Sequence, residues 1–407
     1  MSRSRARANG EGSIFPYRNG FAAYAWVRTP AGDRKRKYVY GPSRDAVHAK
    51  WVKLLDEAGQ RPVATKVPTL GEYLTEWLRD VVEPNLAPLT AATYETLVRL
   101  YLIPGLGPKR LDRLSVRDVQ RWLNSVRQSC QCCVQAKDAR RPQKRRRCCA
   151  VGACCRQVPA PRTVKDLRTV LRSALSHAMS DELISRNVAA MVKTPRGRSR
   201  KAQAWSSEEA RRFLESARDD GDRLYALYVL VLVLGMRKGE VLGLRWEDVD
   251  LDAAQLTIEL QLQRVRRQLL HRETKTEASD ATLPLPAICV AALRLRHAEQ
   301  ARDRLAAGPA WQGAAGLVFT GRFGTPVDPR TVNRAFTARA ARAGVRRITV
   351  HDARRTCASL LADLDVHPRV AMQILRHADF AVTMEVYTQV SSKQTREALW
   401  RLGESLG

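Results

Sequence analysis

Six residues in the second half of the chain offer the groups that phosphoryl transfer requires: cations that bind phosphate oxygens, groups that move protons, and a hydroxyl that attacks phosphorus. They are Arg237, Lys275, His351, Arg354, His377 and Tyr387. They occur in four segments, LGMRKGEVLGLRW, HRETKTEASDATLPLP, HDARRT and LRHADFAVTMEVYTQV. Each residue alone has an ordinary structural explanation, such as a solvated lysine or a half-buried core tyrosine. Their order along the chain favours one shared site.

The chemistry of such a set is consistent. A phosphodiester gathers negative charge on its non-bridging oxygens in the transition state, and two arginines can each bind those oxygens bidentately. A tyrosine hydroxyl, with an ordinary pKa near ~10, is a poor nucleophile until cations and a base favour the phenolate. His351 is the candidate base, Lys275 can protonate the leaving oxygen, and His377 can hydrogen-bond the phosphate. Because the arginines supply the positive charge, we expect no catalytic cofactor or metal.

The segments that position these groups form a mixed but mainly helical region from residue 204 onward. Arg237 follows an apolar helix, and its spacing from Glu240 predicts that the two side chains share a helix face. Three strands are expected, at Leu256–Arg266, in the run up to Thr274 and at Thr282–Leu285. Helices are predicted from Ser206, over Leu224–Leu234 and Lys238–Leu244, and over residues 287–306, 329–343, 352–364, 368–376 and 392–402.

Residues 10–60 are typical of a small sheet backed by one helix. β-prone runs at Ser13–Tyr17, Phe21–Arg28 and Arg34–Tyr40 alternate with turn residues, and Ser43 can cap a helix to about Ala58. Such a unit is too small for an enzyme core but can place a strand face in a DNA groove. The stretch from Gly59 to Pro68 is the expected linker.

The pattern from Thr69 to Val192 predicts a helical domain. Its helices are expected at Thr69–Leu78, Thr90–Tyr101, Ser115–Arg127 and Arg162–Met179, with a break at Pro104, Gly105, Gly107 and Pro108. The domain ends in a basic hinge that can lie across a phosphate backbone. The candidate DNA-binding residues of this hinge are Arg196, Arg198, Arg200 and Lys201.

Length and charge narrow the class of protein. A chain of 407 residues is longer than one compact hydrophobic core usually holds, so two or three domains are expected. Its 70 Lys and Arg residues against 41 Asp and Glu residues leave a formal net charge of +29. Residues 1–65 carry +8, residues 66–200 carry +15 and residues 201–407 carry +6. A surface of this sign attracts polyanions, of which nucleic acid is the most abundant in cells. The longest apolar run, Leu224 to Gly235, is shorter than the ~17–25 residues that span a bilayer, and no signal peptide is apparent, so we expect no membrane partner.

The ordered set of six residues resembles the tyrosine recombinases, the phage integrase family, and the resemblance covers nearly the whole chain. The layout is most similar to actinobacterial phage and integrative-plasmid integrases. The motif HDARRT and the block LRHADFAVTMEVYTQV are its most specific parts. On matching positions the resemblance makes Tyr387 the nucleophile and the other five residues its catalytic partners. Arg376 departs from the pattern, because the family usually has glycine before the histidine that matches His377.

The resemblance implies a multidomain, mainly α fold with small β parts. Residues 1–62 would be an arm-type DNA-binding domain with a three-stranded sheet and a helix. Residues 69–193 would be a helical SAM-like core-binding domain, and residues 202–407 a mixed α/β catalytic domain. The implied function is integration and excision of a mobile element through a 3′-phosphotyrosyl intermediate. A homotetramer on double-stranded attachment sites, helped by an excisionase or a host DNA-bending protein, would act in the bacterial cytoplasm at the nucleoid.

Two other functions are compatible with the same residues. A topoisomerase of this chemistry would relax supercoils as a monomer, although a basic N-terminal sheet domain argues for a recombinase. A non-catalytic DNA-binding regulator would keep the set only as a remnant, although all six groups are present.

A cysteine- and arginine-rich insert, residues 130–155, interrupts the helical domain. Its cysteines are Cys130, Cys132, Cys133, Cys148, Cys149, Cys154 and Cys155. A cytosolic chain does not keep such clusters as disulfides, and thiols this dense favour a structural zinc site. Their spacing matches no standard zinc finger, so a flexible reduced loop remains the alternative. Cys289 and Cys357 lie in apolar helical segments and are expected in the core.

Overall fold

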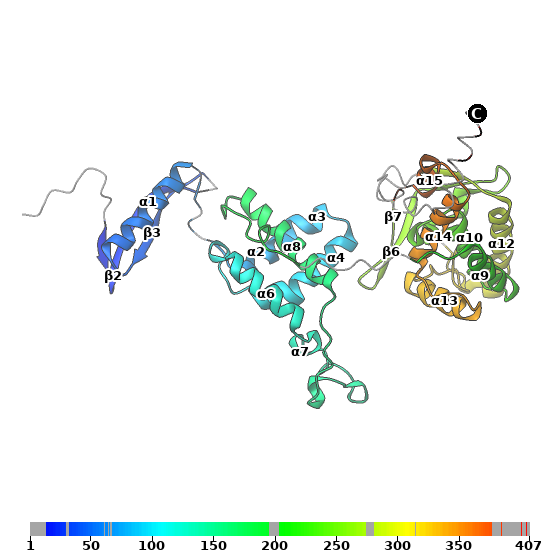
Figure 1. The fold of residues 1–407 in the computed structure, drawn as a ribbon, viewed down its shortest axis with the longest axis horizontal. Coiled ribbons are helices and arrows are strands. Elements are labelled where there is room, and N and C mark those ends of the chain that lie inside the picture. The colour runs from blue at the N-terminus through cyan, green and yellow to red at the C-terminus, as the bar shows by residue number, and fades with distance from the viewer. Residues whose placement is uncertain are drawn as a thin grey trace, which may run out of the picture. The chain divides into compact units, whose positions relative to one another are not determined.

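The computed structural model describes residues 14–29, 32–60, 62–63, 65, 67–194, 203–273, 281–313 and 315–376, together with residues 384, 400 and 404. The chain divides into two compact units, Met1–Arg198 and Ser199–Gly407. Helices dominate both units, with a three-stranded sheet near the N-terminus and small sheets in the second unit (Figure 1). None of the described helices is long and apolar enough to cross a membrane. Of the helix predicted at 392–402, the structure describes Trp400, which is helical.

The N-terminal sheet has the order β1-β2-β3, with β1 at Phe15–Tyr17, β2 at Gly20–Arg28 and β3 at Arg34–Gly41, all antiparallel. Helix α1 (Arg44–Gln60) packs on one face, because alternate residues of β2 bury small apolar side chains. The three strands and the helix were predicted and are confirmed. The expected linker begins too early, because α1 runs to Gln60 and buried Val63 donates its N–H to the Arg28 carbonyl at 2.7 Å.

The other face of this sheet is aromatic and cationic. Tyr38 and Trp26 are 43% and 47% exposed. The Arg36 guanidinium lies 4.7 Å from the Trp26 ring centroid and 4.8 Å from that of Tyr24. Stacked cations and exposed rings together form a surface that suits a polyanion with aromatic bases.

All four predicted helices of residues 69–193 are confirmed. Three are α2 (Leu70–Trp77), α6 (Val116–Gln128) and α8 (Pro161–Ser180), and the fourth, Thr90–Tyr101, is α4 (Pro88–Leu97) with the π-helical turn that continues it. Thr69 and Ser115 cap α2 and α6 through capping boxes, as their sequences indicate. The other short α-helices are α3 (Glu83–Asn85), α5 (Ile103–Leu106) and, in the insert, α7 (Gln131–Val134). One core of Leu, Val, Tyr and Trp side chains joins α2, α6 and α8.

The predicted break between the second and third helices is present at Gly107 and Pro108, but it does not begin at Pro104 as expected. A π-helical turn, Val98–Leu102, follows α4 and leads directly into α5, which contains Pro104 near its start. The wide turn changes the hydrogen-bond register, so the missing N–H of proline is accommodated at the start of a new helical segment. Gly105 serves packing instead, because a Cβ there would lie 2.0 Å from the Trp122 Nε1 atom.

The second unit is built around α10 (Tyr225–Val233), whose residues are almost all buried. The unit's other α-helices are α9 (Ser207–Asp219), α11 (Lys238–Gly243), α12 (Ala287–Ala307), α13 (Pro329–Arg342), α14 (Val350–Asp363) and α15 (Pro368–Leu375). Figure 1 shows α9, α12 and α14 around α10. All of these helices were predicted. Cys289 and Cys357 are buried, as expected.

Two of the three strands predicted in the second unit are confirmed, as β7 (Gln268–Glu273) and β8 (Ala281–Pro284), whereas the first differs from the prediction. The single strand expected at Leu256–Arg266 is two strands, β5 (Gln255–Ile258) and β6 (Leu260–Val265), which belong to different sheets. β5 pairs with β4 (Val249–Asp250) and β8, and β6 pairs with β7. The chain passes from one sheet to the other at Glu259. The almost continuous alternation of apolar residues therefore belongs to two strands in different sheets.

Candidate active site

A glycine turn after α10 delivers the first arginine. Gly235 has φ +58°, and a Cβ on it would lie 2.5 Å from Leu375 Cδ2, so both the conformation and the space require glycine. Arg237 then precedes α11, and its backbone N–H donates to Glu240 Oε2 at 2.8 Å while Nη1 donates to Oε1 at 2.6 Å. The expected shared helix face is therefore wrong. Glu240 caps the start of α11 and thereby also holds the guanidinium.

Arg376, the departure from the family pattern, points toward the same carboxylate. It ends α15 in the left-handed conformation, with φ +52°, and its Nη2 donates to Glu240 Oε2 at 2.7 Å. Its carbonyl accepts from Arg237 Nη2 at 3.1 Å. Burial opposes ionisation of Glu240, but Arg376 and Arg237 outweigh it and hold the pKa of this carboxyl below its usual value. One carboxylate thus links two arginines from distant parts of the sequence.

Arg354 projects from the first turns of α14, which Thr349 caps together with Asp352. Its side chain is buried, and its guanidinium donates to the carbonyls of Gly235 and Leu375. Burial, together with the charge of neighbouring Arg237, lowers the pKa of Arg354 to about 9. Because this value is still above neutral pH, the group stays cationic there.

A cavity of about 880 Å³ brings three of the predicted residues together: Arg237, His351 and Arg354 all line it. Further cations on its wall are Lys238, Arg347 and Arg355, whereas Asp352 is the acidic residue among its lining residues. The single negative charge of Glu240 balances only one of the three positive charges on Arg237, Arg354 and Arg376. The cavity therefore favours an anion, and oxygens of a phosphate are the ligands that arginine binds best.

His351 lines this cavity, and its surroundings favour the neutral form of its imidazole. Partial desolvation by the surrounding protein lowers the pKa of His351 below its usual value, and the positive charges of Arg355 and Arg354 lower it further. A neutral imidazole can accept a proton, which is what a general base must do.

Three predicted catalytic residues, Lys275, His377 and Tyr387, lie outside the described residues, as do the hinge residues. Sequence reasoning missed the roles of Lys238, Arg347 and Arg355 in the cavity wall. The motif HDARRT contained one signal for them, because residues four apart on a helix share a face and Arg355 follows His351 by four.

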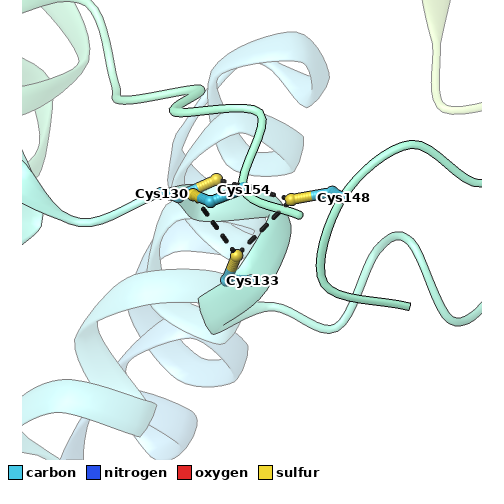
Figure 2. Close-up of side chains that lie close together, drawn as sticks. All are labelled: Cys130, Cys133, Cys148 and Cys154. Atoms are coloured by element: carbon cyan, nitrogen blue, oxygen red, sulfur yellow. Dashed lines mark hydrogen bonds between the residues drawn. The ribbon is translucent and has the colours of Figure 1, made fainter. Parts of the chain in front are cut away.

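The insert of residues 130–155 brings cysteine thiols together, far along the sequence from the arginine cavity. Figure 2 shows Cys130, Cys133, Cys148 and Cys154 converging, with every pair of their Sγ atoms within 4.8 Å. A second group, Cys132, Cys148 and Cys155, shares one member with the first. Cys149 belongs to neither group and is exposed.

Comparison with known proteins agrees with this architecture. The sequence model of the phage integrase family matches residues 204–394, a range that includes all six candidate residues, and the model of the phage integrase N-terminal SAM-like domain matches residues 69–126. An integrase of Streptomyces ambofaciens is 29% identical over 89% of this chain and 88% of its own length. A tyrosine recombinase XerC-like protein of Caldanaerobacter subterraneus is 25% identical over 93% of this chain and 94% of its own.

Solved structures share the fold. The Tn1549 transposon integrase in complex with a circular intermediate DNA superposes with a TM-score of 0.61 at 17% identity, covering 82% of this chain and 99% of that chain. A lambda integrase dimer bound to a COC′ core site gives a TM-score of 0.52 at 15% identity, with 77% and 97% covered. With both family models matched in order and relatives aligned over most of its length, the chain belongs to the phage integrase family of tyrosine recombinases.

Proposed function

We propose that this chain is a site-specific recombinase, an integrase that cuts and rejoins DNA to integrate and excise a mobile element. The observation that carries the proposal is the cavity in which Arg237 and Arg354 meet with a surplus of positive charge. Relatives named integrase and tyrosine recombinase support it, as do solved integrases of the same fold in complex with DNA.

In this reaction the Tyr387 oxygen attacks the scissile phosphorus, and the bond from phosphorus to the 5′ oxygen breaks. His351 accepts the phenol proton, and Lys275 donates a proton to the leaving 5′ oxygen. The product is a 3′-phosphotyrosyl enzyme and a free 5′ hydroxyl. Arg237, Arg354 and His377 bind the non-bridging oxygens as their charge grows. One phosphoester replaces another, so religation to a new 5′ hydroxyl needs no ATP.

The partners follow from this function. The substrate is double-stranded attachment-site DNA, and four copies of the chain act on two duplexes, with an excisionase or a host DNA-bending protein favouring one direction. The exposed aromatic and arginine side chains of the N-terminal sheet suit contact with DNA. The place of action is the bacterial cytoplasm, at the nucleoid.

Two assays run side by side separate this function from its alternatives. The first measures the joining of two DNA fragments that carry candidate attachment sites. These sites are taken from the DNA that flanks the coding region. The second measures relaxation of supercoiled DNA without such sites at low protein concentration. A recombinase joins the fragments, a topoisomerase relaxes supercoils without joining, and a regulator does neither.

The basic hinge is predicted to supply binding rather than chemistry. Replacing Arg196, Arg198 and Arg200 together by alanine should weaken DNA binding and reduce the slope of log K against log salt by roughly 0.9 for each phosphate that the protein no longer neutralises. The measurement is DNA affinity at several salt concentrations. A matched control removes the same charge from exposed positions of α9, at Arg211, Arg212 and Arg218. An equal change of slope in both variants would contradict the assignment of the hinge.

A base at His351 predicts a specific pH profile. The cleavage rate should fall as pH falls through the pKa of His351, and the midpoint of that limb should lie below the ordinary value of ~6.5 because the surrounding protein and Arg355 disfavour the protonated ring. His351→Gln should remove this limb and lower the rate. Replacing Arg355 by Gln should move the midpoint upward. A midpoint that His351→Gln leaves unchanged would exclude the residue as the base.

A further inference from the structure

The insert of residues 130–155 has a fixed conformation that the recombination reaction does not explain. A short helix, α7, carries two of its cysteines, and the chain returns through residues 148–155 to bring the others against it. All nine cysteines of the chain are free thiols in the structure. The insert therefore gathers thiols without joining them by disulfides.

The separations of the sulfur atoms suit a tetrahedral metal ion. Four thiolates bound to zinc at about 2.3 Å in a tetrahedron lie about 3.8 Å from one another. Three of the six Sγ separations are 3.9 Å for Cys130 and Cys148, 3.4 Å for Cys133 and Cys148, and 3.9 Å for Cys133 and Cys154, and the other three are within 4.8 Å. A disulfide needs about 2.05 Å, and the thiolates of a four-iron cluster lie much farther apart because iron and sulfide separate them.

A buried carboxylate organises the loop that supplies Cys148. Asp138 is 0% exposed and accepts from the backbone N–H groups of Arg147, Cys148 and Ala150 at 3.0, 2.8 and 3.1 Å. Arg141 Nη1 donates to it at 2.8 Å. These bonds fix the backbone on both sides of Cys148, whose Sγ lies 3.4 Å from that of Cys133 on α7.

Backbone donors also point at the sulfur atoms. The N–H of Cys155 donates to Cys148 Sγ at 3.3 Å, and the N–H of Arg156 donates to Cys154 Sγ at 3.4 Å. Backbone N–H groups that donate to sulfur are the outer contacts typical of metal-bound cysteines, and here they fix the directions of the two sulfur atoms.

We propose that Cys130, Cys133, Cys148 and Cys154 hold one structural zinc ion that closes the insert. This group offers four mutually close sulfur atoms and completes a tetrahedron, whereas the group of Cys132, Cys148 and Cys155 offers three and would leave a position open. Zinc suits the site because four thiolates and no oxygen or nitrogen ligand favour a soft, redox-inert ion.

Closing the insert has a consequence for DNA, and this part rests on the proposed function. Residues 130–155 carry seven lysines and arginines, and their single carboxylate, Asp138, is buried. Arg145, Arg146 and Arg147 are consecutive and exposed. A cross-linked loop holds these mutually repelling cations in place, so they can contact phosphates without the entropy loss that a flexible tail would suffer.

Metal content tests the site directly on the full chain purified without chelator. About one zinc ion per chain is expected, and Cys133→Ser or Cys154→Ser should lose most of it. Cys149→Ser is the matched control, because Cys149 is a neighbouring exposed cysteine outside both groups, and it should keep the ion. Thermal unfolding of each variant and cobalt absorption bands typical of tetrahedral thiolate ligands separate loss of the ion from loss of the fold.

Several outcomes would overturn the proposal. They are a zinc-free protein whose insert thiols all react with an alkylating probe even after zinc is supplied, equal loss of zinc in Cys149→Ser and Cys133→Ser, and two ions per chain. DNA binding gives an independent result. Replacing Arg145, Arg146 and Arg147 by glutamine should lower the salt slope by roughly 0.9 for each phosphate no longer neutralised, while zinc content stays unchanged. An unchanged slope would reject the DNA contact, and cleavage of a nicked duplex separately reports whether the proposed function holds.

Discussion

Tyr387→Phe is expected to bind attachment-site DNA with near-normal affinity and to form no covalent complex at all. The substitution removes the attacking oxygen and leaves the ring, so binding contacts remain while the phosphotyrosyl bond cannot form. The measurement uses a duplex with a nick close to the cleavage site. Cleavage beside the nick releases a short oligonucleotide that carries the free 5′ hydroxyl. Once it diffuses away, religation cannot occur, and denaturing electrophoresis separates the trapped protein–DNA adduct from unreacted DNA.

Tyr228→Phe is the matched control for this experiment. Tyr228 is buried beside Phe213 and Phe336, burial raises its pKa, and its hydroxyl has no hydrogen-bond partner among the described residues. Removing that hydroxyl should therefore leave adduct formation unchanged and should not lower stability. A covalent complex that persists in Tyr387→Phe would show that another hydroxyl is the nucleophile.

Local signals explain why so many helices could be predicted. Thr69, Ser115 and Thr349 each precede a helix and bond to an acidic residue three positions later, and each forms a capping box. The apolar face of each helix then follows from its 3.6-residue period. These signals lie within one or two helical turns, so the sequence alone contains them.

Features that depend on distant partners could not be predicted. Arginine is usually found at the surface, yet Arg376 is buried. Its burial is possible because Glu240, 136 residues earlier, accepts a hydrogen bond from its guanidinium. The alternation over Leu256–Arg266 continues through Glu259 although the chain changes sheets there. Asp138 is one acid in a basic loop, and only the folded loop reveals that three N–H groups converge on it.

The candidate site divides along the same line. Residue types and order identified Arg237, His351 and Arg354, and the structure brings these three to one cavity. Their supports were harder to foresee: the Gly235 carbonyl that Arg354 binds belongs to a turn whose left-handed conformation shows only in the fold. The motif segments contain both Gly235 and Leu375, but only the fold shows that their carbonyls accept from Arg354.

Those supports decide what the arginine variants should do. Arg237→Ala and Arg354→Ala should each slow cleavage at least ~10²-fold, equivalent to about 2.7 kcal/mol of lost transition-state stabilisation. Their stabilities should differ. The Arg237 side chain is 42% exposed, and Glu240 keeps Arg376 as its partner when Arg237 is removed. Arg354→Ala instead leaves the buried carbonyls of Gly235 and Leu375 without a donor, at a cost of ~1–3 kcal/mol.

Single-turnover cleavage of the nicked duplex and thermal unfolding of each variant measure both effects. Arg354→Lys keeps the charge but cannot reach both carbonyls and a phosphate with one ammonium, so its cleavage should stay close to that of the alanine variant. Arg355→Ala removes the same charge from the same cavity wall and should cost less than about tenfold, because bidentate binding of the phosphate belongs to Arg237 and Arg354. If Arg355→Ala were as slow as Arg354→Ala, the cavity would act through its total charge, and neither arginine would hold the phosphate individually.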